Sequence, residues 1–390
     1  MKKLTIIMLG MSSQAEWDQG ILNKKMQTVQ AGAVNRNFHI LQQILKRPEV
    51  VRVIHVDFLP FTKRKVIKEA LQAKLWRSTS NTQARGLTWR VDSKSPKWWS
   101  LACLRWQDVK HLKPFIPPDT EVVIWSYHPF FPQVFDLFPY AKKVFDSVDN
   151  WAEHPVYAPV KERLKKNYQH IQDQADIIFT VSPDLQNLFA GHQNVTWIPN
   201  GVDVDHFSRE ASNPEQFSTL PRPFVVYIGV IQERLDVELL EQTARLIPSI
   251  QIVLAGPVWA GTPLGGLREL KNVMFLGPVP YQDLPNLLSQ ASAGIIPHRV
   301  NRFTASMNPL KLYEYLASGL PVISTPVQGT EQFASGVRVA TTSTEFAAAI
   351  QQAISLPTPE KQKLKLLVQN QTWDQRIDQM IKIIQRSCPH

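Results

Sequence analysis

A lysine and a glutamate three residues apart form the most chemically informative pattern in this 390-residue sequence. Pro309 suits the first turn of a helix and Asn308 is a favourable N-cap, so Lys311 and Glu314 should share one face near the positive end of the helix dipole. Such a helix start can bind a nucleotide diphosphate: main-chain N–H groups and Lys311 meet phosphate oxygens, and Glu314 accepts the ribose hydroxyls. On spacing alone, a solvated surface pair is the commoner interpretation.

Strand-like runs alternate with amphipathic stretches along the whole chain, which is typical of βαβ units around parallel sheets. Twelve candidate strands begin near residues 4, 53, 122, 143, 176 and 195 in the first half and 224, 250, 273, 293, 321 and 337 in the second. A polar, proline-bearing stretch, 208–223, is predicted to be the interdomain linker. We expect an α/β protein with two doubly wound domains, 1–205 and 206–372, facing each other across a cleft, and a helix over 373–390 that packs back on the first domain.

Four motifs, in order along residues 120 to 340, resemble those of the group 1 glycosyltransferases of the GT-B fold, of the bacterial cell-surface polysaccharide and glycoconjugate type. IPNGVDVDHF (198–207) resembles the interdomain crossover of that family, and GVIQERLDVELL, from residue 229, resembles its phosphate-contacting loop. The segment 272–299 resembles the part that holds the nucleotide base. SMNPLKLYEYLASGLPVISTP (306–326) resembles the donor-binding helix. The resemblance implies a GT-B fold and the use of a nucleotide sugar.

The resemblance also implies donor-binding roles for Gly229, Arg234, Gly277, Val279, Arg299, Asn308, Pro309, Leu310, Lys311 and Glu314. Two positions depart from the family pattern. Retaining members carry a second glutamate eight residues before Glu314, where this chain has Ser306, and Val230 replaces one of the two cations of the phosphate loop. Lys311 can supply the missing charge. Retention or inversion at the anomeric centre therefore stays open.

The N-terminal half is expected to supply the acceptor site and any catalytic base. Inversion needs a carboxylate or histidine within hydrogen-bond reach of the acceptor hydroxyl. Asp149 is the first candidate and His128 the second. In the alternative interpretation, Asp146 and Asp149 are ordinary turn or helix-capping residues. Further acceptor-side candidates are Trp17, Asp18, Gly20 and Tyr127.

All of the excess positive charge lies in the first half of the chain. Residues 1–198 contain 27 Lys and Arg against 17 Asp and Glu, whereas residues 199–390 contain 16 of each. Within this half, residues 61–115 carry 13 basic and 3 acidic residues and five of the eleven tryptophans. This pattern has three interpretations. The charges can be solvated surface over tryptophans of the core, the segment can dock on anionic lipid headgroups, or it can bind an anionic polysaccharide. Nucleic acid ranks last because no recognised binding motif accompanies the charge.

The sequence thus predicts a glycosyltransferase, of the hexosyltransferase type, that moves a sugar from a nucleotide diphosphate sugar, with UDP-sugars favoured, to a hydroxyl of a lipid-linked or saccharide acceptor. Arg234, Lys311 and a helix start would stabilise the leaving diphosphate, so no cofactor or metal is required. The alternatives are a GT-B nucleotide-sugar epimerase and a catalytically silent, membrane-associated scaffold. The cysteine count and the interpretation of residues 4–9 as a strand, rather than a secretory signal, favour the cytoplasm, with docking on the inner face of the membrane as an option.

Overall fold

The structure, a computed structural model, describes residues 2–10, 34–58, 83–84, 87–91, 97–103, 106–209, 213, 215–259 and 261–387. It divides into two compact units. Among the described residues, the N-terminal unit holds 2–10, those within 36–198, and 377–387, and the C-terminal unit holds 34–35 and those within 199–376. The chain therefore passes between the units after Ile198 and after Arg376, where the sequence predicts divisions after residues 205 and 372.

Within its described residues, the N-terminal unit is built around one nine-stranded sheet with the order β3-β4-β5-β2-β1-β6-β7-β8-β9. Neighbouring strands from β5 to β9 run parallel, and β3 and β4 add an antiparallel edge. The strands are β1 (Leu4–Leu9), β2 (Val50–Phe58), β3 (Gln83–Ala84), β4 (Leu87–Val91), β5 (Trp98–Cys103), β6 (Glu121–Ser126), β7 (Lys142–Ser147), β8 (Ile177–Thr180) and β9 (Val195–Trp197). The six predicted strands are confirmed. The other three lie in the basic, tryptophan-bearing segment and were not predicted.

Helices and 3-10 turns complete the N-terminal unit: α3 (Arg36–Lys46), η1 (Trp106–Phe115), η2 (Pro132–Leu137), η3 (Trp151–Glu153), η4 (Pro155–Val160), α5 (Lys161–Gln174), α6 (Pro183–Leu188) and, from Ile377 on, the greater part of α14 (Trp373–Arg386). The chain's last helix is bonded to this unit. Arg47, just after α3, pairs with Asp378 of α14 (2.8 Å). The buried Lys142 ammonium donates to the Ile384 carbonyl (2.5 Å) and pairs with Glu121 (2.8 Å).

The C-terminal unit contains a parallel six-stranded sheet with the order β12-β11-β10-β13-β14-β15. Its elements are α7 (Val204–Ser208), β10 (Phe224–Ile228), α8 (Val237–Leu246), β11 (Gln251–Ala255), η5 (Leu267–Glu269), β12 (Val273–Gly277), η6 (Tyr281–Asp283), α9 (Leu284–Leu288), β13 (Ala293–Ile296), α10 (Arg302–Ala305), α11 (Leu310–Ala317), β14 (Val322–Ser324), η7 (Thr330–Phe333), β15 (Val337–Val339), α12 (Ser343–Ile354) and α13 (Thr358–Leu366). All six predicted strands are confirmed.

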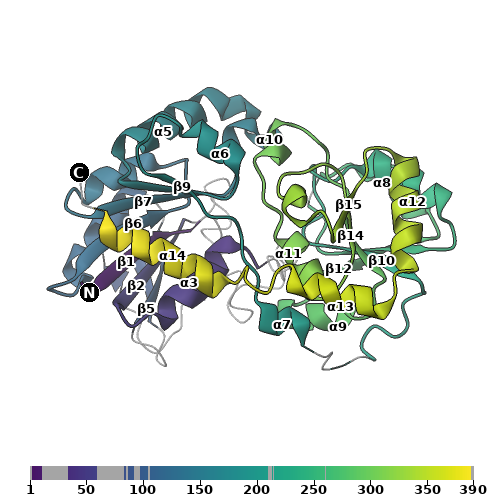
Figure 1. Cartoon of the computed structure of the whole chain (residues 1–390). Coiled ribbons are helices and arrows are strands. Elements are labelled where there is room, and N and C mark those ends of the chain that lie inside the picture. The colour runs from purple at the N-terminus through teal and green to yellow at the C-terminus, as the bar shows by residue number, and fades with distance from the viewer. Residues whose placement is uncertain are drawn as a thin grey trace. The chain divides into compact units, whose positions relative to one another are not determined.

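Alternating side chains of the central strand β10 enter two different cores, as the two-residue period of a strand requires. Val225 and Tyr227 pack with residues of α8 and α12, and Val226 and Ile228 pack with residues of α11 and α9. The sheet of this unit is therefore covered by helices on both faces (Figure 1). This is the doubly wound arrangement, in which ligands bind beyond the carboxyl ends of the strands.

The predicted linker, 208–223, belongs to the C-terminal unit where the structure describes it. Leu220 is 7% exposed and packs in the same core as Phe207 of α7. Apolar side chains therefore anchor this largely polar stretch to the core. No helix in the described part of the chain combines the length and apolar character needed to cross a bilayer.

Candidate functional site

The predicted donor residues Lys311 and Arg234 lie at the carboxyl edge of the C-terminal sheet. Lys311 extends from the first turn of α11, and its ammonium donates a hydrogen bond to the hydroxyl of Tyr227 on β10 (3.3 Å). The same ammonium lies 4.4 Å from the centre of the Tyr227 ring. This contact joins the helix to the end of the central strand.

Arg234 lies on the loop between β10 and α8, and that loop is held by the segment after β13. The Arg299 N–H donates to the Arg234 carbonyl (2.8 Å), and Leu235 forms an isolated antiparallel bridge with His298. His298 is fixed in turn by Thr325, whose hydroxyl accepts from its N–H (3.1 Å) and donates to its carbonyl (2.7 Å). Arg234 therefore lies on a loop that main-chain hydrogen bonds hold in place.

The electrostatics of this cluster favour an anionic ligand. Burial, with the nearby charge of Arg234, lowers the pKa of Lys311 to about 7, and Glu314 opposes that shift. Burial raises the pKa of Glu314 to about 7, against the effect of Lys311. Burial and both cations hold the pKa of His298 well below its usual value, so this imidazole is neutral. A diphosphate would offset the mutual repulsion of Lys311 and Arg234.

Glycines bring the strand ends close together at this edge. Gly229 has a positive φ of 114°, and a Cβ there would lie 3.5 Å from the Lys311 ammonium. A Cβ on Gly256 would lie 2.0 Å from the Gly229 carbonyl oxygen, which is a clash. The missing side chain at Gly256 allows the two strand ends to approach, and the missing side chain at Gly229 leaves the space beside Lys311 open.

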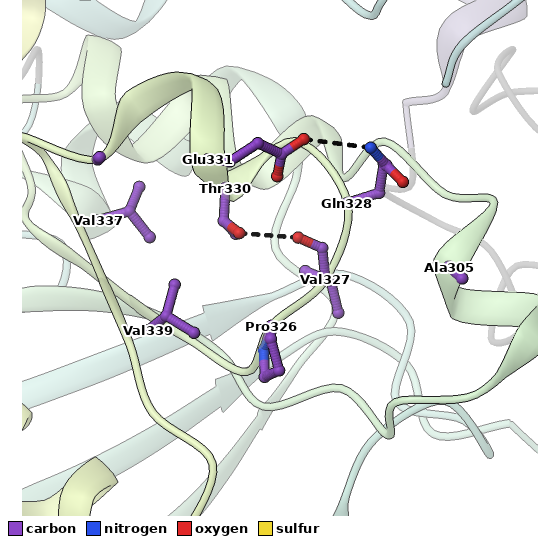
Figure 2. Close-up of a pocket in the computed structure, with 9 residues that line it drawn as sticks. Ala305, Pro326, Val327, Gln328, Thr330, Glu331, Val337 and Val339 are labelled. Carbon is purple, nitrogen blue, oxygen red and sulfur yellow. Dashed lines mark hydrogen bonds between the residues drawn. The ribbon is translucent and has the colours of Figure 1, made fainter. Parts of the chain in front are cut away.

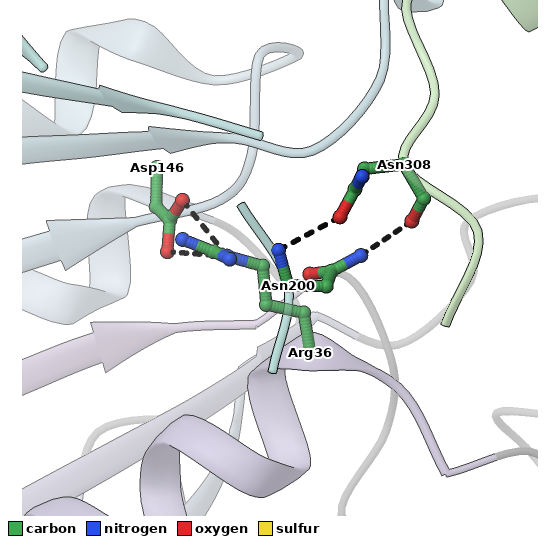
Figure 3. Close-up of polar contacts among 4 residues, drawn as sticks. All are labelled: Arg36, Asp146, Asn200 and Asn308. Carbon is green, nitrogen blue, oxygen red and sulfur yellow. Dashed lines mark hydrogen bonds and ion pairs between the residues drawn. The ribbon is translucent and has the colours of Figure 1, made fainter. Parts of the chain in front are cut away.

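Asn308 does not cap α11, contrary to the sequence prediction. Pro309 occupies the N-cap position, and no side chain there bonds to the helix. The Asn308 side-chain oxygen instead accepts from the Asn200 N–H (2.8 Å), and the Asn200 amide donates to the Asn308 carbonyl (2.5 Å) (Figure 3). The cause is a partner far away in the sequence. Asn308 is 6% exposed, and its side-chain oxygen accepts a hydrogen bond from the buried Asn200 N–H instead of from the helix.

The segment predicted to hold the nucleotide base packs in part in the same core as α11. Gly277 ends β12 with a positive φ of 79°, and Val279 is 7% exposed in the core beside α11. Tyr281 stacks on His206 with ring centres 4.3 Å apart, and its pKa is raised by burial and by the Glu314 carboxylate. Of the other predicted donor residues, Leu310 is half-buried and Arg299 is exposed.

Ser306, at the position of the family's second glutamate, is fully buried and donates its hydroxyl to the Phe303 carbonyl (2.7 Å). A cavity of about 420 Å³ beside the neighbouring Ala305 is lined mainly by apolar side chains after β14 and on β15 (Figure 2). The polar groups in its wall bond locally: Gln328 donates to Glu331 (3.1 Å) and Thr330 donates to the Val327 carbonyl (2.8 Å). This cavity is a weaker candidate for the donor site than the Lys311 cluster.

In the N-terminal unit, the structure reveals a buried ion pair that the sequence does not predict. Arg36, at the start of α3, directs Nε to both carboxylate oxygens of Asp146 on β7, each 3.1 Å away (Figure 3). Asp146 is completely buried and Arg36 is 3% exposed. Burial raises the pKa of Asp146 and Arg36 opposes that shift. Asp146 is therefore part of a buried pair, not a turn or capping residue.

The predicted acceptor-side residues differ in accessibility. Tyr127 is 1% exposed, and burial and Asp146 raise its pKa well above the usual value. Asp149 is half-buried on the loop after β7. Trp17, Asp18 and Gly20 lie outside the described residues.

His128 is poorly suited to act as a base. Burial lowers its pKa to about 3, so the ring is neutral near pH 7. Its Nδ1 accepts a hydrogen bond from the Phe130 N–H (3.3 Å), which assigns the remaining hydrogen to Nε2. His128 therefore presents a hydrogen-bond donor. The described residues include no group of three or more His, Cys, Asp or Glu side chains that could hold a metal ion.

Residues 222–355 match the family of glycosyl transferases group 1. The chain is also 27% identical over 229 residues to a protein of Bacillus subtilis (strain 168) assigned to teichuronic acid biosynthesis as glycosyltransferase TuaH. That alignment covers 54% of this chain and 56% of the relative, so the chain matches about half the length of this curated protein.

Solved structures with the same fold extend over nearly the whole chain. Sucrose-phosphate synthase from Thermosynechococcus elongatus superposes with a TM-score of 0.71 at 15% identity, covering 98% of this chain and 99% of that one. The Anabaena protein HepE in complex with UDP gives a TM-score of 0.64 at 13% identity, covering 98% and 99%. At these identities the likeness establishes the fold.

Proposed function

We propose that this chain is a group 1 glycosyltransferase of the GT-B fold and that it transfers a sugar from a nucleotide diphosphate sugar to a hydroxyl of a saccharide or lipid-linked acceptor. The observation that carries the proposal is the cluster of Lys311, Arg234 and Glu314 at the carboxyl edge of the C-terminal sheet. Two cations beside one buried carboxylate suit a ligand with adjacent phosphates and a ribose.

In the proposed reaction, the acceptor hydroxyl oxygen forms a bond to the anomeric carbon while the bond from that carbon to the diphosphate breaks. Lys311, Arg234 and the first N–H groups of α11 stabilise the negative charge that develops on the departing diphosphate. Glu314 accepts hydrogen bonds from the ribose hydroxyls. No metal is needed for this charge stabilisation, so turnover should persist in excess EDTA.

The fate of the acceptor proton distinguishes the candidate residues of the N-terminal unit. In an inverting route, the Asp149 carboxylate takes the proton as the new bond forms. His128 would instead donate its Nε2–H to a substrate oxygen, because its Nδ1 is already an acceptor. The fully buried Ser306 hydroxyl bonds to α10, so a carboxylate contact to the transferred sugar is not expected from that position.

UDP is the proposed nucleotide, and two solved structures of one neighbour support it. The Anabaena protein HepE has been solved with UDP and with UDP and glucose. The relationship to a protein of teichuronic acid biosynthesis supports a saccharide acceptor used in making a cell-surface polymer. Neither the epimerase nor the silent-scaffold alternative finds support in these relatives.

We place the reaction in the cytoplasm, with the basic segment 61–115 able to dock on anionic lipid. Only part of that segment is described. Trp99 on β5 is half-buried, with the Arg52 guanidinium 4.5 Å from its ring centre, so this tryptophan belongs to the fold. Cosedimentation with anionic and neutral vesicles tests the docking, and equal binding to both would exclude it.

Purified protein incubated with radiolabelled nucleotide sugars, with and without saccharide acceptors, tests the proposed activity. The expected result is acceptor-dependent release of the nucleotide by the wild type and by Lys363→Ala, which removes an exposed lysine of α13. Lys311→Ala should show no turnover. A changed sugar without any acceptor would identify an epimerase, and no turnover of any donor would favour the scaffold.

A further inference from the structure

The two cations of the donor cluster lie on elements that are separate in the sequence, and a flexible lysine needs a fixed partner to point at a phosphate. Among the described residues, the hydrogen-bond partner of the Lys311 ammonium is Tyr227, at 3.3 Å. Tyr227 lies on β10, two residues before Gly229, and is fully buried. Its ring also lies under the ammonium, at 4.4 Å from ring centre to nitrogen.

The hydroxyl of Tyr227 has one hydrogen, and its neighbours determine where that hydrogen goes. The hydroxyl donates to the Val230 carbonyl, 3.1 Å away on the loop that leads to Arg234. It therefore acts as an acceptor toward Lys311. His298 Nε2 lies 3.5 Å from the same oxygen, and because the hydroxyl hydrogen is directed to Val230, this nitrogen can only donate there.

This geometry links both sides of the donor cluster through one oxygen atom. We propose that Tyr227 is a positioning residue for the donor diphosphate, because its hydroxyl holds the Lys311 ammonium against the loop that carries Arg234. The inference rests on the proposed function and adds to it a residue that would not itself touch the donor. Two N–H groups of the ammonium remain for phosphate oxygens.

The charged and titratable groups around Lys311 fix the direction of the expected effect. Arg234, from the loop after β10, and burial disfavour the protonated amine, whereas Glu314, from α11, favours it. His298, from the segment after β13, is neutral. An acceptor hydroxyl stabilises the ammonium, so its removal should make Lys311 lose its proton at a lower pH.

Tyr315 provides a matched control between the same two elements. It lies on α11, is fully buried, and its hydroxyl accepts from the Ile228 N–H on β10 (2.8 Å). Tyr227→Phe and Tyr315→Phe therefore each remove one buried hydroxyl and keep the ring. Only the first removes the partner of Lys311.

The test is calorimetric titration with UDP from pH 6 to pH 9 for wild type, Tyr227→Phe, Tyr315→Phe, Lys311→Ala and the Tyr227→Phe/Lys311→Ala double variant, with thermal melts to verify folding. Tyr227→Phe should bind UDP about tenfold more weakly at pH 8 than the wild type, with a smaller loss at pH 6. As the pH rises, the UDP affinity of Tyr227→Phe should decline at a lower pH than that of the wild type. Tyr315→Phe should retain the wild-type pH profile, even if it melts earlier.

Two results would overturn the inference while leaving the donor site intact. One is a Tyr227→Phe profile that coincides with the wild-type profile. The other is an equal loss of UDP affinity from Tyr227→Phe with and without Lys311, because a positioning role requires the two changes to be non-additive. Failure of the wild type to bind UDP, or unchanged binding by Lys311→Ala, would instead contradict the proposed function itself.

Discussion

Asn200 and Asn308 are joined by two hydrogen bonds, one from the Asn200 main-chain N–H to the Asn308 side chain and one from the Asn200 side chain to the Asn308 carbonyl. Asn200 follows directly on the residue where the C-terminal unit begins, and Asn308 stands just before α11. The Asn200 carbonyl also accepts from Arg376 at the other end of the unit (3.4 Å). The segment before α11 is thus bonded to Asn200, which is itself held by Arg376 at the other end of the stretch 199–376.

Asn308→Ala should lower the free energy of unfolding of the C-terminal unit by about 1–3 kcal/mol, because it leaves the buried Asn200 N–H without its acceptor. Urea unfolding followed by fluorescence measures the loss. Asn370→Ala, at an exposed turn of the same unit, is the control and should change stability by less than about 0.5 kcal/mol. Equal effects of the two substitutions would show that the Asn200 contact adds nothing.

UDP binding should be tightest near pH 7 and accompanied by proton uptake just above it. Lys311 has a pKa lowered to about 7, so it loses charge as the pH rises, and a bound diphosphate raises that pKa again. Glu314 has a pKa raised to about 7, so it loses its carboxylate as the pH falls. Calorimetry at pH 8 in buffers of different ionisation enthalpy measures the uptake; a binding heat independent of the buffer would refute the assignment to Lys311.

Glu314→Gln should reduce the preference of the protein for ribose. The wild type should bind UDP about tenfold more tightly than 2′,3′-dideoxy-UDP, the size of effect expected from hydrogen bonds to a charged acceptor. The variant should bind the two ligands with nearly equal affinity. Competition against a fluorescent nucleotide at pH 7.5, above the pKa of about 7 of Glu314, measures both constants with the carboxylate ionised. A preference retained in the variant would place the ribose elsewhere.

Asp146→Asn should destabilise the N-terminal unit by about 3–5 kcal/mol, since it leaves the buried Arg36 guanidinium without its counter-charge. Glu162→Gln breaks an exposed pair with Lys165 and serves as the control, with an unfolding midpoint expected to stay close to that of the wild type. Urea unfolding of both variants decides the matter. Similar unfolding midpoints would mean that the buried pair is dispensable.

The sequence predicts the strands well where they are continuous apolar runs, because buried parallel strands require such runs. The apolar pattern does not predict β4 and β5, because arginine, threonine, serine and tryptophan interrupt it and positive charge dominates the composition of their segment. The Lys311 and Glu314 pair could be predicted because both residues lie on one helix and belong to a stretch, 306–326, that resembles a motif of a known family.

The Arg36 and Asp146 pair could not be predicted in this way. Its partners are 110 residues apart and only the sheet brings them together. Asn308 likewise has the local signature of a helix cap, but its partner Asn200 is visible only in the fold. Tyr227 looks like any aromatic residue of a buried strand, and its contact with Lys311 depends on where α11 packs.

The donor cluster is tested most directly by calorimetric titration of UDP at pH 6.5 into wild type, Lys311→Ala and the surface control Lys363→Ala. We expect the wild type and Lys363→Ala to bind UDP equally and Lys311→Ala to bind about 10- to 100-fold more weakly, because it loses a charge-assisted hydrogen bond to phosphate. Equal affinity of all three proteins would contradict this expectation.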